Sequence, residues 1–510
     1  MAEEKRVPSR LVQFLAGAEE PPSTPWRLLS TFGLAPLLLV FFLLVTAHFA
    51  YTPDDTYIYL QYARNIAAGN GFAFNAGIPS YGITGPLWAL LIAAGTAGGL
   101  DPYIVAKVFD LMFGSMALMG TYLLAIALLR NRVYALLCAI VVGFDAWVLR
   151  WTASGMESSL AVLLVVVAIR YAYLNQYSAA SIAAAALALV RPEGALLLMV
   201  IIADNFVNSR DRRRSATDAL RMIAVFAILV VPWIVYAWIE FGTPVPNTFA
   251  AKAGWSLSPP ELAGTAWNIL KQVGATQPWT TAVAVLGTVF LIHRRGWREV
   301  RSELFPALWV VLLIVFYLAA DVQVVSRYLL MAIPFLVLGA FWVLRRMAEA
   351  HILPAPVATA AAIVLCLVSV VQNQYVYDAV VVPHLRNFEE GMTSALKPMA
   401  YWLDANAAPN ATVLTPDVGM LGYDSHRQMY DVGGLITPEV RRAFRGLTYD
   451  EGMMTAAYRR VVVPDFVVDR APTAERLASP TVRPIMSRNF PGLGIARPDS
   501  VIYTLYQVMK

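Results

Sequence analysis

The stretch LLSTFGLAPLLLVFFLLVTAHFAYTPDD, residues 28–55, joins a long apolar run directly to two adjacent acids, Asp54 and Asp55. An apolar run of about 20 residues predicts a membrane-spanning helix. The segment 1–27 before it carries four basic residues, and basic residues tend to stay on the cytoplasmic side. A retained first helix is favoured over a cleaved signal peptide, because the leader and the apolar run are both long. We therefore expect the acid pair at the outer surface of the membrane.

The composition is that of a polytopic membrane protein. Of the 510 residues, 58% are hydrophobic and only 14% are charged, which is too apolar for an ordinary water-soluble protein. The net charge of +5 is small and is explained by basic cytoplasmic loops, so no nucleic-acid partner is expected. Cys138 and Cys366 both lie in apolar runs. They are expected to be buried packing residues with no disulfide or zinc role.

Further apolar runs and basic clusters alternate along the chain. The runs lie at about 85–100, 103–129, 133–149, 158–174, 178–190, 195–207, 219–240, 279–292, 305–319, 327–344 and 353–374. The basic clusters are 130–132, 210–214, 293–301 and 345–346. If every run crossed the membrane, all of these clusters would lie outside, against the positive-inside rule. If the short, Gly-rich run 85–100 is re-entrant or lies on the surface, they all lie inside, which predicts about eleven crossings.

This topology places four loops on the same side as the acid pair. They are 150–157, 191–194, 242–254 and 321–327. The apolar runs 178–190 and 195–207, on either side of loop 191–194, are both short for a span. We expect them to form a helical hairpin whose tip dips into the membrane and lines a cavity, because irregular backbone at that depth must be buried in protein or wet.

The pattern of the chain changes after Val376. Residues 395–510 combine a helical pattern at 396–405 with short strand-like runs separated by turn residues. The strand-like runs are 412–415, 428–431, 460–463 and 465–468. The predicted fold class is mainly α: a transmembrane domain over 28–376, with a first outer loop at 51–102, and a small extracytoplasmic α/β domain over 377–510.

The acid pair has both a structural and a functional explanation. An acid at a helix N-terminus caps free amides and complements the helix dipole, worth about 0.5–2 kcal/mol for the cap, but one acid is enough for that. Ile58, Tyr62 and Ile66 follow at helical spacing, which indicates an interfacial helix that presents a carboxylate to a cavity. Ionisable groups in such a setting are candidates for function.

Residues 54–88 read DDTYIYLQYARNIAAGNGFAFNAGIPSYGITGPLW. Their order of Asp-Asp, Arg-Asn, Gly-x-Gly-x-x-x-Asn and Thr-x-x-x-Trp resembles the GT-C superfamily of polytopic glycosyltransferases, in particular relatives of the mycobacterial terminal arabinofuranosyltransferase. Further segments resemble motifs of these proteins, namely 154–158, 191–194, 246–252 and 327–328. The chain departs from the arabinofuranosyltransferase at 78–82 and in a shorter C-terminal region.

The resemblance implies a membrane enzyme that transfers a sugar, arabinofuranose among the candidates, from a polyprenyl-phosphate donor to a glycan acceptor in the cell envelope, outside the cytoplasm. It implies Asp54 as the base that takes the acceptor proton, Asp55 as an acid that orients the acceptor, and Lys252 and Arg327 as ligands of the leaving phosphate. The remaining expected cavity residues are Arg64, Asn75, Trp88, Glu157, Arg191, Glu193, Asn247 and Tyr328. No cofactor or metal is expected, although the need for a divalent cation is left open.

Several of these residues also have a simple structural explanation. Lys and Arg side chains snorkel at membrane interfaces. Arg191 and Glu193 can pair with each other across the hairpin tip, and Glu157 can cap the helix that it begins. Lys107 and Asp110 are spaced i, i+3 and are expected to neutralise each other within the membrane.

Two other functions compete with glycosyl transfer. A transporter or flippase for a lipid-linked sugar usually has internal inverted repeats and charges at the membrane midplane, whereas the notable acids here lie at the outer surface. A non-catalytic scaffold for wall assembly would use the C-terminal domain for binding. Only the enzyme requires the acid pair for turnover.

Overall fold

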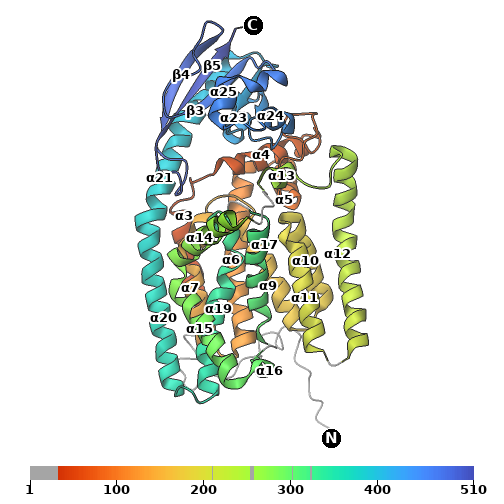
Figure 1. Ribbon diagram of the computed structural model, residues 1–510, viewed down its shortest axis with the longest axis vertical. Coiled ribbons are helices and arrows are strands. Elements are labelled where there is room, and N and C mark those ends of the chain that lie inside the picture. The colour runs from red at the N-terminus through yellow and green to blue at the C-terminus, as the bar shows by residue number, and fades with distance from the viewer. Residues whose placement is uncertain (1–32, 210, 253–257, 301–302, 322–323, 510) are drawn as a thin grey trace.

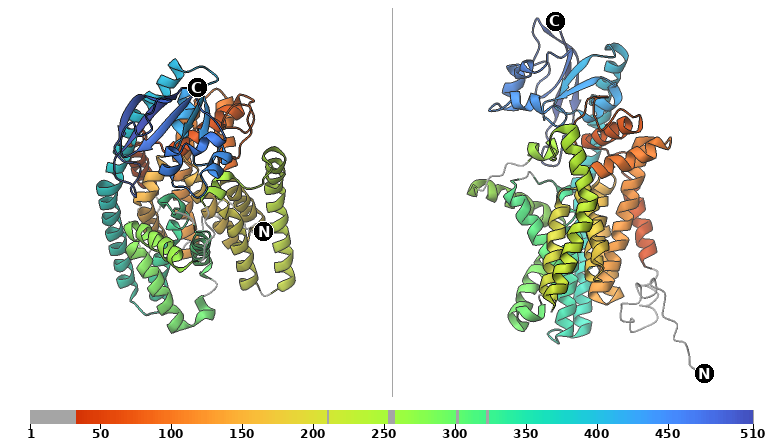
Figure 2. Two further views of the ribbon diagram at one scale, coloured as in Figure 1. Left: turned by 45° about the horizontal axis from the view of Figure 1, so that its top comes forward. Right: turned by 90° about the vertical axis from the view of Figure 1, so that its right-hand side faces the viewer.

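The computed structural model describes residues 33–209, 211–252, 258–300, 303–321 and 324–509. A tall bundle of helices forms most of the molecule, and a small α/β domain that contains β3, β4 and β5 lies at one end of it (Figures 1 and 2). The predicted class, mainly helical with a small C-terminal sheet, is confirmed.

The helices of the bundle and of its loops follow one another along the chain. They are α3 (Leu34–Thr46), α4 (Asp54–Ala67), α5 (Pro86–Ala97), α6 (Pro102–Leu129), α7 (Arg132–Gly143), α8 (Ala146–Thr152), α9 (Ser158–Tyr173), α10 (Tyr177–Val190), α11 (Glu193–Asn208), α12 (Arg212–Phe241), α13 (Asn247–Lys252), α14 (Pro259–Thr276), α15 (Pro278–Arg295), α16 (Trp297–Val300), α17 (Phe305–Ala319), α18 (Ser326–Leu329), α19 (Ile333–Glu349) and α20 (Ala355–Val376). Asp and Asn side chains begin several of them. Asp101, for example, accepts hydrogen bonds from two amides of the first turn of α6, which are groups that a helix cannot satisfy itself.

Fewer helices than expected are clear membrane spans. Among the described residues, three are long and apolar enough to cross a membrane, or up to five if each of two bent pairs counts as one span. The pairs are α7 with α8, bent by 62°, and α14 with α15, bent by 108°. Five further apolar helices are shorter than the roughly 20 residues of a span. The expectation of about eleven crossings is therefore supported only for three to five of them.

The segment 51–102, predicted as the first outer loop, contains two helices that lie beside each other near the α/β domain. Helix α4 begins at the acid pair, and α5, with 12 residues, packs against it (Figure 1). Because α5 is one of five short apolar helices among the described residues, the reading of the run 85–100 as a surface or re-entrant segment stays a prediction. The predicted hairpin is present, because α10 and α11 pack together and only Arg191 and Pro192 lie between them.

One continuous helical segment of 52 residues, Ala355–Asn406, links the bundle to the α/β domain. It comprises α20, α21 (Val382–Gly391) and α22 (Lys397–Asn406), joined by the two π-helical turns η2 (Tyr377–Val381) and η3 (Met392–Leu396). The domain boundary expected at 376/377 thus falls inside a helix with no loop.

The α/β domain has a five-stranded sheet in the order β2-β1-β3-β5-β4. Its elements are β1 (Thr412–Thr415), α23 (Gly419–Ser425), β2 (Gln428–Asp431), α24 (Pro438–Ala443), α25 (Tyr449–Met454), η4 (Ala457–Arg460), β3 (Phe466–Ala471), β4 (Val482–Phe490) and β5 (Val501–Val508). Strand β1 pairs in parallel with β2 and β3, whereas β5 is antiparallel to β3 and β4. The strands expected at 412–415 and 428–431 are confirmed, and the run 465–468 largely corresponds to β3. The strand expected at 460–463 is wrong, because that segment is the end of η4 and a turn.

Other expectations concern buried residues of the bundle. Cys138 and Cys366 are free and buried, as predicted. Lys107 and Asp110 are also buried. Their opposite charges attract each other, while each makes its hydrogen bonds to other partners. The ammonium of Lys107 donates to two backbone carbonyls, one of them Ala153 O at 2.6 Å. Asp110 accepts from the backbone amide of Gly155 at 2.8 Å and from nearby serine hydroxyls. Lys107 and Asp110 therefore both stabilise the turn between α8 and α9.

Candidate active site

Asp55 and Arg327 form an ion pair at the end of the bundle that faces the α/β domain. Asp55 lies in the first turn of α4, and Arg327 lies in α18. Arg327 Nη2 donates to Asp55 Oδ2 at 2.7 Å, and the side chains are 10% and 38% exposed, respectively. A charge-assisted bond of this length fixes the position of both groups. The pair therefore stays accessible on the carboxylate side.

Two cavities meet at this ion pair. The smaller, which we term the inner cavity, has a volume of about 80 Å³. The larger, which we term the outer cleft, has a volume of about 720 Å³ and lies between the bundle and the α/β domain. Asp55, Arg327 and Tyr328 line both of them. These three expected site residues therefore lie where a ligand in the inner cavity could contact a ligand in the outer cleft.

The hairpin tip supplies the inner cavity with a second set of charges. Arg191 Nη1 donates to Glu157 Oε1 at 2.9 Å, and its Nη2 donates to Glu193 Oε1 at 3.3 Å. The guanidinium also lies over the ring of Tyr328, 4.6 Å from its centroid. The expected pairing of Arg191 with Glu193 is confirmed. Glu157 precedes α9 but makes no capping hydrogen bond, so the capping explanation for this residue is wrong.

The loops that the topology placed on one side come together here. The inner cavity is lined by residues from each of these loops, including Glu157, Arg191, Thr248 and Arg327. Charge distribution between apolar runs was thus sufficient to predict that four distant segments share one end of the bundle.

Arg150 is a cation of the outer cleft that the sequence did not single out. It lies on α8 and is only 8% exposed. Its Nη2 contacts His384 Nε2 at 3.0 Å and donates to the Tyr51 hydroxyl at 3.3 Å. Within the described part of the chain, no carboxylate pairs with it and its Nε has no hydrogen-bond partner. A buried cation without a counterion is costly, and the cleft that it lines gives an anion access to it.

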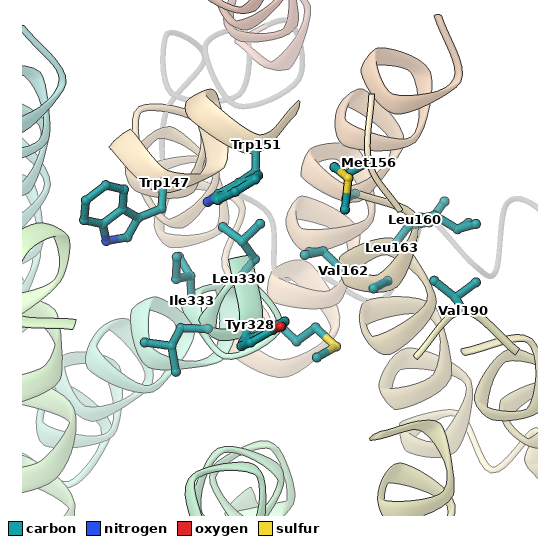
Figure 3. Packing of buried hydrophobic residues seen from close by; sticks show 14 of the residues in the cluster. Trp147, Trp151, Met156, Leu160, Val162, Leu163, Val190, Tyr328, Leu330 and Ile333 are labelled. Atoms are coloured by element: carbon teal, nitrogen blue, oxygen red, sulfur yellow. The ribbon is translucent and has the colours of Figure 1, made fainter. Parts of the chain in front are cut away.

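Aromatic side chains hold this part of α8 in place. Figure 3 shows Trp147 and Trp151 near Leu330 and Ile333, at the start of α19. The indole nitrogen of Trp151 donates to the hydroxyl of Ser326 at 2.8 Å, one residue before Arg327. This contact connects the helix that carries Arg150 to the helix that carries Arg327.

Asp54 has a different environment from Asp55. Its two carboxylate oxygens accept the backbone amides of Gly419 and Met420, at 2.8 and 2.9 Å, which form the first turn of α23 in the α/β domain. Burial, followed by the neighbouring Asp417 carboxylate, raises the pKa of Asp54 to about 7, and the two amides oppose this shift. Asp54 also lines the outer cleft, but both of its oxygens are engaged by the domain above it.

Four of the expected cavity residues, Asn247 among them, lie outside the two cavities. Arg64 donates to Tyr423 O at 2.9 Å and stacks over the ring of Tyr423. Asn75 exchanges two hydrogen bonds with the backbone of Met429 on β2, at 2.8 and 2.9 Å. Trp88 is fully buried. Arg64 on α4 and Asn75 in the segment that follows α4 therefore bind the α/β domain, and Trp88 belongs to the core.

The last two expected residues lie on α13. Asn247 donates through Nδ2 to Leu435 O at 2.9 Å and so contacts the α/β domain. Leu435 lines the inner cavity. Lys252 ends α13, and its side chain lies outside the described part of the structure. Among the described residues, no group of three or more His, Cys, Asp or Glu side chains is placed to hold a metal ion.

Comparisons with known proteins identify the fold. A family profile described as a domain of unknown function, DUF8728, matches residues 384–503, which include most of the α/β domain. No curated protein matches the chain in sequence. Among solved structures, ArnT from Cupriavidus metallidurans in the apo state is similar with a TM-score of 0.60 and 14% identity, over 93% of this chain and 98% of that one.

Two ligand-bound structures share the same arrangement. ArnT bound to undecaprenyl phosphate has a TM-score of 0.55 and 13% identity, over 94% of this chain and 98% of that one. The archaeal oligosaccharyltransferase AglB from Archaeoglobus fulgidus, in complex with an inhibitory peptide and a dolichol-phosphate, has a TM-score of 0.59 and 12% identity, over 86% and 69%. Neither comparison tests the narrower resemblance to the arabinofuranosyltransferase. The chain therefore shares its fold with ArnT and AglB.

Proposed function

We propose that this protein is a membrane glycosyltransferase that moves a sugar from a polyprenyl-phosphate donor to a hydroxyl of a glycan acceptor. The observation that carries the proposal is the Asp55–Arg327 pair, where a carboxylate and a guanidinium meet between two cavities. Solved proteins of the same fold bind dolichol-phosphate and undecaprenyl phosphate, which supports a lipid phosphate as the ligand here.

The two walls of the outer cleft suit two different substrates. On the side of the bundle, the wall includes Ala275, Val376 and Val380, which are apolar and suit a polyprenyl chain that enters from the bilayer. On the side of the α/β domain, the wall includes Asp417 and Arg470, which suit the hydroxyls of a glycan. The donor and acceptor would meet at the acid pair.

The reaction requires a base on one side and cations on the other. The acceptor oxygen attacks the anomeric carbon, the bond from that carbon to the phosphate oxygen breaks, and the hydroxyl proton passes to a carboxylate. We assign Asp55 as this base, because Asp54 is engaged through both oxygens by amides of the domain. Arg327, released from Asp55 by the incoming phosphate, and Arg150 stabilise the negative charge on the leaving group.

The remaining details follow the sequence resemblance. Arabinofuranose is the first donor sugar to test, and a cell-envelope glycan is the expected acceptor. The α/β domain and the reaction site face the outer side of the plasma membrane in this proposal. Lys252 is a further candidate ligand of the donor phosphate, because α13 carries Thr248 and Phe249 into the inner cavity.

The experiment is transfer by detergent-purified protein from a panel of polyprenyl-phosphate sugars, with and without a chelator of divalent cations. Asp55→Asn should keep the thermal melting temperature within a few degrees and lose transfer by about 10²–10⁴ fold, the typical contribution of a general base. Asp54→Asn should retain measurable transfer. Full loss in Asp54→Asn with near-normal turnover in Asp55→Asn would reverse the two roles. Normal turnover in both variants would reject the catalytic assignment and leave a transporter or a scaffold.

A further inference from the structure

A second cavity of the α/β domain lies away from the ion pair. It has a volume of about 820 Å³ and lies at the carboxyl ends of the parallel strands β1 and β2, next to α24 and α25. We term it the arginine groove after four residues that line it, which are Arg441, Arg442, Arg445 and Arg470. Ligands of open α/β sheets bind at the carboxyl ends of the strands, so the position by itself suits a binding site.

The charge of the groove is strongly one-sided. Its lining contains four arginines and no Asp or Glu among the described residues. Arg442 pairs with Glu439 at its exposed edge, and Arg470 pairs with Asp417. In the described part of the chain, Arg441 and Arg445 have no carboxylate within ion-pair distance. Two uncompensated guanidinium groups in one concavity attract anions.

Hydrogen bonds to one buried carboxylate hold together the loop that shapes the groove. The buried Asp431 carboxylate accepts the amides of Leu435, Ile436 and Thr437, at 2.6, 3.1 and 2.9 Å. Gly434 has φ +73°, and a Cβ at this position would lie 2.6 Å from Cβ of Arg441. The glycine therefore allows the stem of Arg441 to pack against the loop, while the residue as a whole stays exposed to a ligand.

Two aromatic side chains complete the groove. Tyr449 and Phe444 both line it. The Tyr449 hydroxyl donates to Asp469 at 2.8 Å, which fixes the position of its ring, and the guanidinium of Arg470 lies 5.8 Å from the centroid of the same ring. The guanidinium of Arg476 lies 5.6 Å from the same centroid, and Phe444 is only 7% exposed. The Tyr449 ring therefore serves to position the cations around it.

The groove adjoins the outer cleft. Arg470 lines both cavities, and its Nη1 donates to Asp417 Oδ2 at 2.7 Å. Asp417 lines the outer cleft together with Asp54 and Asp55. A polymer that lies in the groove can therefore extend past Arg470 toward the ion pair.

We propose that the arginine groove binds an anionic glycan, a chain that bears carboxylate or phosphate groups. Its role as the acceptor in transfer rests on the proposed function, whereas the binding itself does not. The continuity of the groove with the outer cleft through Arg470, and the place of the groove on the domain instead of on the apolar bundle, favour a glycan over an anionic membrane surface.

The test is binding of fluorescently labelled oligogalacturonate to the purified full-length protein at low salt. The expected result is saturable binding that weakens as salt is added, with no binding of a neutral maltooligosaccharide of equal length. Arg441→Gln combined with Arg445→Gln should weaken binding at least tenfold. The matched control, Arg483→Gln combined with Arg488→Gln on the exposed face of β4, should bind like the unaltered protein.

Three outcomes would overturn the inference. They are equal binding of the neutral oligosaccharide, unchanged binding by the groove variant, and a preference for vesicles containing anionic lipid over the oligosaccharide. Asp55→Asn separates this inference from the proposed function, because it should abolish transfer and leave binding intact. If no sugar donor supports transfer but the groove variant still loses binding, the proposed function fails and the groove stands.

Discussion

Asp55 and Arg327 are 272 positions apart in the sequence, and their side-chain atoms lie 2.7 Å from each other. One comes from the first turn of α4 and the other from α18, just before α19. The pair can form only when the segment 51–102 and the end of the bundle are both in place. The presence of this ion pair therefore indicates that the site has assembled.

Replacing Arg327 with Gln should weaken use of the donor. One charge-assisted bond to the phosphate is worth about 1.5–3 kcal/mol, or about 10 to 100 fold in kcat/KM. The measurement is transfer at varied donor concentration. Arg483→Gln, on the edge strand β4, is the control and should be normal. Unchanged donor kinetics in Arg327→Gln would remove this residue from the phosphate site.

Arg150→Gln should separate activity from stability. Arg150 is buried without a carboxylate partner among the described residues, so its removal relieves a desolvation cost and should leave the melting temperature unchanged or raise it. Donor kcat/KM should still fall, by about 10 fold or more, if Arg150 contacts the phosphate. A large drop in melting temperature with normal kinetics would show that the role of Arg150 is structural.

Gly419→Ala should undock the α/β domain from α4. A Cβ at this position would clash with the carbonyl oxygen of Asp54. The backbone must therefore shift, which breaks the hydrogen bonds from the amides of Gly419 and Met420 to the Asp54 carboxylate. We expect faster proteolysis within the domain and loss of transfer. Gly264→Ala, in α14 where nothing lies within 4 Å of the added carbon, should have no such effect. Equal protease resistance in both variants would contradict the docking role.

The pH dependence of stability should report on Asp54. Its pKa is raised from 3.8 to about 7 in the folded protein, so ionising it costs folding free energy. This cost is absent below about pH 4 and complete above about pH 7. The melting temperature of the native protein, relative to that of Asp54→Asn, should therefore fall by a few degrees between pH 5 and pH 8. A difference that stays constant or rises over this range would contradict the raised pKa.

Hydropathy and charge patterns in the sequence were sufficient to predict several elements of the fold. The hairpin of α10 and α11 and the strands β1 to β3 follow from patterns within single segments. The shared side of the four loops follows from the alternation of apolar runs and basic clusters along the chain. Strand β4 was missed because it is an edge strand with Arg483 and Arg488 exposed to solvent, so it shows little apolar alternation. The run 460–463 is rich in Val but forms a turn, because tertiary context overrides strand propensity.

The roles of site residues depended on partners that are distant in sequence. Arg64 and Asn75 resemble family motif residues, but they bind the backbone of Tyr423 and Met429. Asp54 is likewise held by Gly419, 365 positions away. Arg150 gave no signal because its significance lies in the absence of a described counterion, which only the folded arrangement can show.

The helix Ala355–Asn406 is unbroken. Its length therefore sets both the distance of the α/β domain from the bundle and the direction in which the domain faces. Each residue of a helix turns the following chain by about 100° and advances it by about 1.5 Å. Insertion of one residue would rotate the domain and move Gly419 away from Asp54. Insertion of about one full helical turn would return Gly419 to nearly the same orientation toward Asp54. A π-helical turn is how a helix absorbs one extra residue locally, and η2 and η3 have the form of two such insertions. Related chains are therefore expected to differ in the length of this segment in steps of roughly a helical turn, or to offset smaller changes with further π-turns.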